Sequence, residues 1–365
     1  MRIELLVPCW DEKLPVFLGV VEVRMVDDRF VMGRYYLPAD ARVRREAEGR
    51  LARLFASRGF EEIIPPILVG LGVAGMDPSG GWLGGNCSGA NGLGRSGALG
   101  ASGGGYGSSG GSGVSYAVLT RDGCLMTLRC DFTMPVAALA ARHLLRSGET
   151  VRLFYSGSVF RAQKPGSGKQ EEWRQVGVEL MGSAADDGSD VELLSLAAES
   201  LLSLGVRDFS IGIGHAGLLE KVLRRAGAEG ERLAEAWRAL AGRDFVLFGK
   251  LTSGLDQGAL CALRMPVEDG PVSSEPEAKA LAQTMDALRE RGLADCFRLD
   301  LTIARELDYY TGIVFEAYAR GAGNAVIGGG RYDTLLERFG ASAPAAGFAI
   351  DMDSLVCAMG VQCDA

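Results

Sequence analysis

The sequence predicts an α+β fold, in which antiparallel strands and helices occupy separate parts of the chain. Strand-type and helix-type segments do not alternate as they do in a βαβ sheet. A hairpin signal, Asp122-Gly123, lies between two apolar runs, which is typical of antiparallel strands. The chain has 365 residues and 47% hydrophobic content, which is enough for one large core or two domains.

The first clear element is a helix that follows Pro38 and ends at Gly59. Its predicted buried face carries apolar residues at helical spacing: Val43, Ala47, Leu51, Leu54 and Phe55. The apolar run EEIIPPILVG comes next. Because Pro65 and Pro66 each lack a backbone N–H, we expect this run to be an edge or interface strand. Residues 1–36 match no motif, and we assign no role to this N-terminal extension.

Residues 79–113 are rich in glycine and serine. Such a segment cannot bury enough apolar surface to offset the entropy lost on ordering, so we expect a flexible surface insertion. A phosphate-binding glycine loop is the alternative. The segment contains no GxxxxGK[ST] motif and no GxGxxG between a strand and a helix, which favours the insertion.

Three local signals define the middle of the chain. A helix begins at Thr133, with Pro135 in its first turn, where proline is favourable. A long hairpin follows, and its two strands flank a polar loop at residues 164–171. Asp190 is predicted to cap the next helix, which Gly205 closes.

The C-terminal part contains both element types. In chain order we predict a strand at 206–214, helices at 217–242 and 276–292, and strands at 297–310 and 312–319. The last two strands flank a turn at Thr311-Gly312. Two further segments, 324–340 and 343–360, complete the ordered chain.

Composition excludes several classes of function. The sequence has no uncharged apolar run of about eighteen residues, so we expect no membrane span. Acidic residues near the N-terminus argue against a signal peptide, and we therefore expect a cytoplasmic protein. The net charge is −8 and no Lys/Arg-rich run occurs, which disfavours nucleic acid as a partner.

The cysteines do not form a metal-binding pattern. The chain has eight cysteines but no CxxC pair, and only two histidines. Reduced core cysteines of a cytosolic protein explain this usage better than a zinc site does. We therefore expect neither a metal ion nor another cofactor.

Several polar residues stand alone in apolar strand-type segments. Asp131 and Thr133 are two residues apart, and Gln175 and Glu179 are four apart, so each pair is expected to share a strand face. Arg305 begins the segment RELDYY. A lone polar residue in a strand is more often exposed to solvent than functional. Here the flanking residues are apolar, which predicts burial, and buried polar groups need partners.

The chemistry of this set suits a zwitterion with a polar side chain. Asp131 would oppose an ammonium group, and Arg305 would pair with a carboxylate. Glu179 and Tyr310 would accept or donate hydrogen bonds at the side-chain end of the ligand. The residues therefore predict an amino-acid pocket.

Four motifs resemble, in order and spacing, those of histidyl-tRNA synthetases: LRCDFTMPVAALAAR, RLFYSGSVFR…RQVGVELMG, RELDYYTGIVFEAY and GGGRYDTLLERFG…PAAGFAI. They are still more similar to the paralogous regulatory subunits of ATP phosphoribosyltransferase, which typically have LRPDFT where the synthetases have LRPEGT. The resemblance covers about residues 37–356 apart from the glycine-rich insertion, and leaves residues 357–365 as a tail.

This resemblance implies a class II aminoacyl-tRNA synthetase-like core. Such a core has a six-stranded antiparallel sheet flanked by helices and forms dimers through the motif that contains Pro66. The chain has too few residues after the last motif for an anticodon-binding domain.

The resemblance also assigns roles around the ligand's backbone groups. Asp131 and Thr133 match the residues that meet the α-amino group of histidine. Gln175 matches an amide beside the amino and carboxylate groups. Arg305 matches the arginine near the carboxylate.

A second group of positions matches the imidazole end of the pocket. Glu179 and Tyr310 correspond to the pair that holds the imidazole nitrogens, and Tyr309 lines the same cavity. Arg161, in SVFR, is an arginine that the family retains, and it completes the candidate ligand set. Compared with the synthetases, the set differs in having Asp131 in place of a glutamate.

The positions expected to face a nucleotide are changed. Adenylate formation needs positive charge around the phosphates. Arg161 is retained, but Ser354 replaces the arginine of the last motif and Asp351 replaces a glycine. In the loop after SVFR, Glu171 replaces an arginine and Gln163 replaces a glutamate. The resemblance therefore implies a ligand pocket without adenylation activity.

These observations predict a non-catalytic regulatory subunit. It would bind histidine, assemble with the short catalytic form of ATP phosphoribosyltransferase and control the first step of histidine biosynthesis. We expect a homodimer within a hetero-oligomer. A divergent or truncated histidyl-tRNA synthetase-like activating enzyme and a stand-alone amino-acid-binding protein are the alternatives.

Overall fold

The structure is a computed structural model. It describes residues 2–3, 21–22, 35–74, 116–145, 149–163, 170–183, 185, 187–265, 270–305 and 309–360. The predictions for the glycine-rich insertion, for most of the N-terminal extension and for residues 164–169 and 306–308 lie outside the described residues. The domain boundaries stay predictions.

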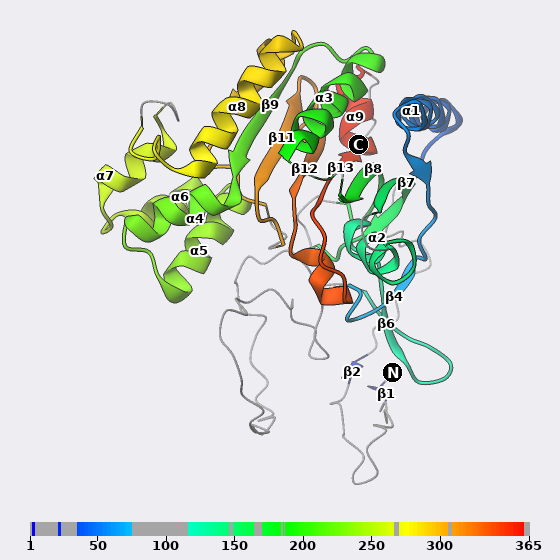
Figure 1. The fold of residues 1–365 in the computed structure, drawn as a ribbon. Helices are drawn as coiled ribbons and strands as arrows, with labels where there is room; N and C mark the ends of the chain where they lie inside the picture. Colours follow the sequence, from blue (N-terminus) through cyan, green and yellow to red (C-terminus); the bar gives the residue numbers. More distant parts are fainter. Residues whose placement is uncertain are drawn as a thin grey trace.

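An eight-stranded sheet lies at the centre of the molecule, in the order β10-β9-β11-β12-β13-β8-β7-β3 (Figure 1). Its six inner strands are antiparallel: β9 (Phe209–His215), β11 (Ile313–Ala319), β12 (Ile327–Arg331), β13 (Ala345–Asp351), β8 (Glu172–Gly182) and β7 (Thr150–Phe160). The two short outer strands, β10 (Phe297–Leu299) and β3 (Glu61–Glu62), pair in parallel. The predicted six-stranded antiparallel sheet is therefore extended by one parallel strand at each edge.

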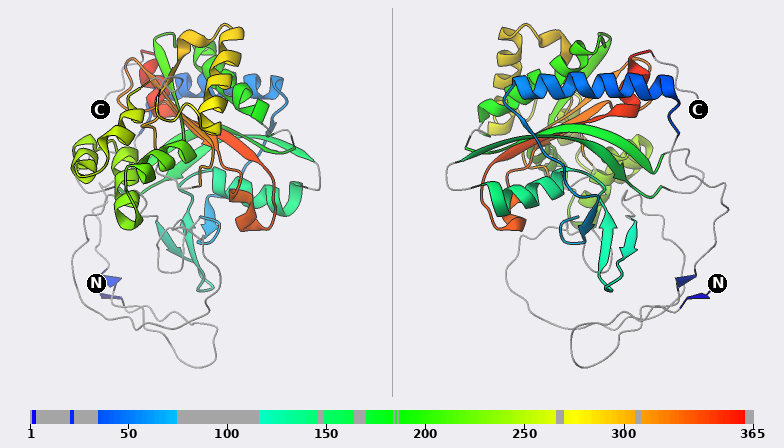
Figure 2. Two further views of the ribbon diagram at one scale, coloured as in Figure 1. Left: turned by 60° about the vertical axis from the view of Figure 1, so that its left-hand side comes forward. Right: turned by 90° about the vertical axis from the view of Figure 1, so that its right-hand side faces the viewer.

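Helices cover both faces of this sheet (Figure 2). One face packs against α1 (Pro38–Ser57), α3 (Asp187–Ser203), α8 (Pro276–Glu290) and α9 (Met352–Ala358). The predicted face of α1 supplies Ala47, Leu51 and Phe55 to this core, and Gly59 follows the helix with a positive φ of 79°. No helix in the described part of the chain is long and apolar enough to span a bilayer.

The opposite face carries a smaller layer. It consists of α2 (Thr133–Leu139), a π-helical turn (Ala140–Leu144) and a short 3-10 helix, η4 (Leu335–Phe339). Strand residues of β7 and β8, including Tyr155 and Met181, pack against this layer. The candidate site lies on this face.

A helical lobe lies beside the β9–β10 edge of the sheet (Figure 1). It contains α4 (Ala216–Arg225), α5 (Gly230–Ala241), α6 (Phe245–Thr252) and α7 (Gln257–Leu260), followed by η2 (Cys261–Leu263). Polar side chains cap three of its helices: His215 caps α4, Asp244 caps α6 and Asp256 caps α7. A further 3-10 turn, η3 (Ala294–Cys296), leads from α8 to β10.

A small sheet has the order β4-β6-β5. Its strands are β4 (Leu68–Gly70), β6 (Leu125–Leu128) and β5 (Ala117–Leu119), and Gly123 turns the predicted hairpin with a positive φ of 84°. Pro65 and Pro66 lie outside both β3 and β4. The single strand predicted for this run is therefore divided into two short strands, each at the edge of its own sheet. Two short strands, β1 (Arg2–Ile3) and β2 (Val21–Glu22), pair with each other.

Three predictions of local structure are wrong. The predicted strand at 297–310 ends at Leu299, because the side chain of Asp300 accepts hydrogen bonds from the N–H and hydroxyl of Thr302 and so forms a turn. Tyr309 and Tyr310 therefore lie outside any strand.

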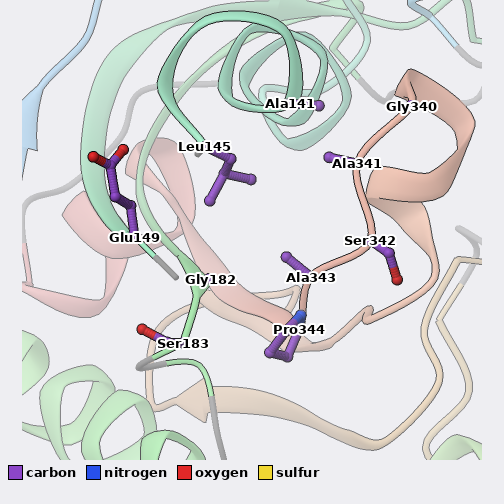
Figure 3. A pocket seen from close by; sticks show the side chains of 10 residues that line it. All are labelled: Ala141, Leu145, Glu149, Gly182, Ser183, Gly340, Ala341, Ser342, Ala343 and Pro344. Atoms are coloured by element: carbon purple, nitrogen blue, oxygen red, sulfur yellow. The ribbon is translucent and has the colours of Figure 1, made fainter. Parts of the chain in front are cut away.

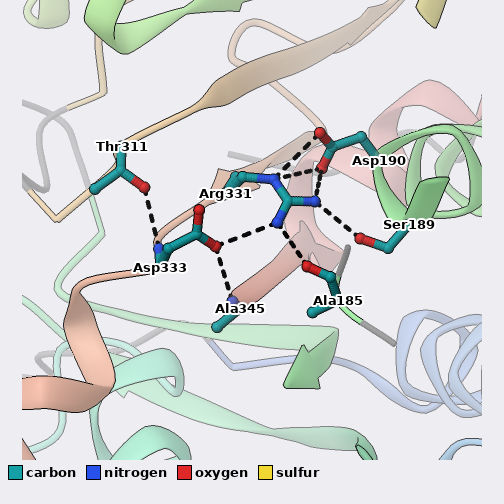
Figure 4. Close-up of polar contacts among 7 residues, drawn as sticks. All are labelled: Ala185, Ser189, Asp190, Thr311, Arg331, Asp333 and Ala345. Carbon is teal, nitrogen blue, oxygen red and sulfur yellow. Dashed lines mark hydrogen bonds and ion pairs between the residues drawn. The ribbon is translucent and has the colours of Figure 1, made fainter. Parts of the chain in front are cut away.

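Asp131 and Thr133 are not strand residues either, since α2 begins at Thr133. Asp190 does not cap α3, because that helix begins at Asp187. Asp190 instead pairs with the guanidinium of Arg331 at 2.7 Å, in a buried network that also includes Ser189 and the carbonyl of Ala185 (Figure 4).

Candidate functional site

Glycines create space on the sheet face beneath α2. Gly347 of β13 lies directly opposite Glu179 of β8, and Gly177 lies opposite Tyr155 of β7. A β-carbon on Gly347 would collide with the Glu179 carboxylate, and one on Gly177 would collide with the Tyr155 hydroxyl. The missing side chains allow Glu179 and Tyr155 to lie across the sheet.

Glu179 is the centre of the site. Its carboxylate accepts hydrogen bonds from the hydroxyls of Thr133 at 2.7 Å, Tyr155 at 3.2 Å and Tyr332. All four residues are buried. Burial raises the pKa of Glu179 to about 7, although the three hydroxyl donors oppose this shift.

Aromatic rings form one wall of the site. The ring centroids of Tyr309 and Tyr310 are 4.8 Å apart, and those of Tyr309 and Tyr332 are 5.6 Å apart. On the other side of Glu179, Phe132 stacks on Tyr155 at 4.2 Å. Burial and the neighbouring acidic groups hold the pKa of Tyr309 well above its ordinary value, so its hydroxyl keeps its proton.

Asp131 supplies a second buried carboxylate, with only 5% of its surface exposed. Its Oδ1 accepts a hydrogen bond from the N–H of Met134 at 3.3 Å, in the first turn of α2. Its Oδ2 is buried and makes no hydrogen bond of normal length, although the Tyr309 hydroxyl lies near enough to this carboxyl to lower its pKa. Burial raises the pKa of Asp131 to about 6 against the opposing positive charge of Arg161.

Arg305 brings positive charge to the same region. Its Nη1 donates to Glu316 Oε1 at 2.8 Å, and its guanidinium lies over Gly328, where a β-carbon would collide with it. Its Nε is buried without a hydrogen-bond partner. Burial alone would lower the pKa of Arg305, but Tyr310 and Glu316 outweigh this effect and raise it.

Arg161 and Gln175 lie toward the other end of the β7–β8 hairpin. Arg161 donates to the carbonyl of Cys130 at 3.0 Å, and its guanidinium lies 5.2 Å from the Trp173 ring. Gln175 is on the same strand and face as Glu179, as predicted, but lies opposite Asp351 of β13.

Interactions therefore link seven of the eight predicted ligand residues into one cluster: Asp131, Thr133, Arg161, Glu179, Arg305, Tyr309 and Tyr310. Gln175 shares their sheet face.

Sequence reasoning missed three members of the site. Tyr155 and Tyr332 bind Glu179, and Glu316 binds Arg305. The sequence signals were weak but present, because Tyr332 is part of the GGGRYD motif and Glu316 is a lone charge in the apolar run GIVFEAYA.

Acidic groups occupy the positions expected to face a nucleotide. The Asp351 carboxylate accepts a hydrogen bond from the N–H of Ser354 at 2.7 Å and thereby caps α9. Burial raises the pKa of Asp351 to about 6. The Glu171 carboxylate accepts a hydrogen bond from the N–H of Gln163 at 3.3 Å. The side chains at these positions therefore bond to the protein's own backbone.

A hollow of about 450 Å³ lies elsewhere, between the turn that follows α2 and the loop before β13 (Figure 3). Its lining includes Leu145, Glu149, Ser183 and Pro344. It shares no residue with the polar cluster around Glu179.

Comparisons with known proteins agree with this geometry. A family model described as histidyl-tRNA synthetase matches residues 115–355. A protein from Moorella thermoacetica named ATP phosphoribosyltransferase regulatory subunit is 34% identical over 89% of this chain and 80% of its own length. A protein of the same name from Symbiobacterium thermophilum is 31% identical over 89% of this chain and 78% of its own. The chain belongs to the ATP phosphoribosyltransferase regulatory-subunit family.

Solved structures place this regulatory-subunit family member in the predicted fold. An ATP phosphoribosyltransferase regulatory subunit/histidyl-tRNA synthetase from Bacillus halodurans superimposes with a TM-score of 0.72 at 25% identity, covering 93% of this chain and 84% of that one. A histidine–tRNA ligase subunit from Alicyclobacillus acidocaldarius superimposes with a TM-score of 0.68 at 25% identity, covering 93% of this chain and 99% of that one. The class II synthetase-like fold and the regulatory-subunit family are both confirmed, whereas the ligand roles of individual residues stay predictions.

Proposed function

We propose that this regulatory subunit binds L-histidine in the polar cluster around Glu179 and thereby controls the first step of histidine biosynthesis. Its partner would be a short-form catalytic subunit of ATP phosphoribosyltransferase, in the cytoplasm, where ATP is available. The family assignment supports the regulatory role, and the chemistry of the cluster supports the ligand.

One observation carries the ligand assignment. Asp131 Oδ2 and Arg305 Nε are both buried and both lack a hydrogen-bond partner, and they carry opposite charges. A buried polar group left unpaired costs about 1–3 kcal/mol, and more when it is charged. The ammonium and carboxylate groups of an amino acid would satisfy the two atoms together.

Glu179 and Tyr310 would determine which ligand side chain the cluster accepts. Glu179 already accepts three hydroxyl hydrogen bonds, and an ionised carboxylate has about four acceptor positions. An imidazole N–H would fill the remaining position, with Tyr310 beside it. An apolar side chain would bury Glu179 without adding a donor, and this difference favours histidine.

Inhibition by histidine requires that histidine bind more tightly to one state of the complex than to another. We propose a homodimer as the core of this complex. The segment around Pro65 and Pro66 supports this, because Ile64 is 86% exposed and Ile67 is 48% exposed. Arg129 donates to the Pro65 carbonyl at 2.7 Å and lies over the Phe132 ring, so the proposed interface reaches the site.

An amino-acid-activating enzyme fits these groups less well. Asp351 and Glu171 would place negative charge where the phosphates of ATP are expected, and Ser354 provides no guanidinium there. Carboxylates oppose phosphate binding, so the geometry favours regulation over adenylation.

The test is reconstitution with a short-form catalytic subunit. We expect the phosphoribosyltransferase rate to depend on added regulatory subunit and to fall when L-histidine is added. A complex carrying Glu179→Gln should keep its rate without histidine, and should need at least about tenfold more histidine for inhibition, because one charge-assisted hydrogen bond is weakened. A rate that histidine lowers equally in both complexes would contradict the proposed pocket.

A further inference from the structure

The turn between α5 and α6 has an unusual backbone. Arg243 has a φ of 58° and is the one non-glycine residue with positive φ among the described residues. It terminates α5: its N–H donates to the Leu240 carbonyl and the N–H of Asp244 donates to the Ala239 carbonyl. Glycine is the residue that tolerates this conformation without strain. An arginine here indicates that its side chain is needed.

The Arg243 side chain reaches the sheet. Its Nη2 donates to Glu316 Oε2 and to the Tyr318 hydroxyl, and its guanidinium lies 5.1 Å from the Tyr318 ring. Glu316 is 7% exposed and accepts from Arg305 through its other carboxylate oxygen, Oε1. One buried carboxylate is therefore shared between an arginine of the site and an arginine of the helical lobe.

The two neighbouring strands leave room for this arrangement. Glu316 lies directly opposite Gly212 of β9 and Gly328 of β12. A β-carbon on Gly328 would collide with the Arg305 guanidinium. The position of Arg305 is therefore set by the sheet and by Glu316 together.

The helical lobe makes a second contact with Arg305. The indole N–H of Trp237, in α5, donates to the carbonyl of Arg305 at 3.3 Å. Trp237 and Tyr310 also both pack against the buried cluster that contains Ile303 and Val314. Both the main chain and the side chain of Arg305 are therefore tied to α5 or to the turn that ends it.

We propose that Arg243 is a positioning residue that prepares Arg305 to receive the carboxylate of the ligand. Arg305, Glu316 and Arg243 together carry one positive charge. Without Arg243 the remaining pair is neutral. Glu316 Oε2 would then keep only the neutral Tyr318 hydroxyl as a donor at 2.6 Å, so the negative charge of Glu316 would compete more strongly with the ligand for Arg305. Because coupling is reciprocal, binding of the carboxylate at Arg305 would also strengthen the attachment of the helical lobe to the sheet.

This inference rests on the proposed binding of histidine, and it is tested by comparing two ligands on the full chain. L-histidinol has the ammonium and imidazole of L-histidine but no carboxylate. Calorimetric titration of Arg243→Ala should show histidine affinity lowered about fivefold or more, since a charge-assisted contact is weakened, while histidinol affinity changes less than about twofold. Arg243→Lys should restore part of the loss.

Two control variants distinguish a loss of Arg305 positioning from a loss of folding stability. Arg243→Gly relieves the backbone strain while removing the guanidinium, so it should melt no lower than Arg243→Ala and should lose histidine affinity to the same extent. Arg238→Ala removes an arginine from the same helix that pairs with the exposed Glu231, and it should leave both affinities unchanged.

The outcomes distinguish the two proposals. Suppose the unaltered chain binds histidine. If Arg243→Ala then lowers the affinities for histidine and histidinol equally, or changes neither affinity, the positioning role is wrong but the proposed pocket stands. If the unaltered chain binds no histidine, the proposed function fails and this inference fails with it.

Discussion

The two ends of the β8–β13 strand pair both carry a buried or nearly buried acidic side chain, but the surroundings differ. At one end Glu179 faces Gly347 and accepts hydrogen bonds from three side-chain hydroxyls. At the other end Asp351 faces Gln175, and its carboxylate accepts the N–H of Ser354. The Glu179 carboxylate accepts three side-chain hydrogen bonds and has the capacity for about one more. The Asp351 carboxylate instead caps α9.

This difference supports the proposal that the ligand binds at the Glu179 end. Near Glu179, one oxygen of Asp131 and one nitrogen of Arg305 are buried and unpaired, so opposite charges are available to an amino acid. Near Ser354, Asp351 already has a partner and adds negative charge. On the proposed function, a fold shared with synthetases would keep a site for the amino acid while the positions expected to face a nucleotide bond to the protein itself.

The largest expected effect comes from removing the support behind the amino-acid end. Arg331 precedes Tyr332 and is buried in contact with Asp190, Ser189 and the Ala185 carbonyl (Figure 4). Arg331→Met would remove the guanidinium from this buried ion pair and should lower the free energy of unfolding by about 3–5 kcal/mol. Urea denaturation measures this free energy of unfolding. Arg338→Met, at an exposed position, should change it by less than about 0.5 kcal/mol.

The next effect concerns ligand affinity. Arg305→Ala should weaken histidine binding by at least about thirtyfold, because it removes the positive charge proposed to pair with the carboxylate, worth about 2 kcal/mol or more. Isothermal calorimetry gives the affinity, and Arg320→Ala, which removes an arginine with an 86% exposed side chain, serves as the matched control. Equal affinities in the two variants would remove Arg305 from the site.

A third prediction uses the pKa of Glu179, which burial raises from 4.5 to about 7. A carboxyl that holds its proton more tightly in the folded state stabilises the fold at low pH. This contribution is lost as the pH rises through the folded pKa. Between pH 4.5 and 7, the unfolding free energy should therefore decline more in the unaltered chain than in Glu179→Gln.

The expected difference is on the order of 2 kcal/mol across this range, from the pKa shift. Urea denaturation at several pH values, without histidine, measures it. Titrating groups that do not interact with Glu179 cancel in the comparison. His215 is one of them: burial lowers its pKa to about 4, so its own contribution to stability rises with pH. Parallel pH profiles would show that Glu179 is not held in its protonated form.

The smallest effect belongs to the other end of the strand pair. Asp351→Ala removes the cap of α9 and should lower the free energy of unfolding by about 1 kcal/mol. Histidine affinity should change less than about twofold, since Asp351 does not contact the polar cluster. Thermal unfolding and calorimetry measure the two quantities. A large loss of histidine affinity would show that the two ends are not independent.

Much of this site could be predicted from sequence because polar residues interrupt apolar segments. Asp131, Thr133, Glu179 and Tyr310 were identified in this way and lie in one cluster. Tyr332 was missed because its contact with Glu179 depends on strand order: β13 lies between β12 and β8, and this order cannot be derived from either segment alone.

The errors in local structure have a related cause. Helical spacing and turn residues predicted α1 and α2 well. Asp190 has the chemistry of a helix cap, but its partner is Arg331, more than a hundred residues away. Asp300 ends the strand that the apolar pattern would have continued, through a side-chain turn with Thr302. Local patterns therefore predict elements better than they predict which distant charge a side chain will meet.

The most direct test of the account is a calorimetric titration of the purified chain with L-histidine and, separately, with ATP in the presence and absence of histidine. The proposed function predicts saturable binding of one histidine per chain and no binding of ATP under either condition. Histidine-dependent binding of ATP, or a chain that binds ATP but not histidine, would contradict it.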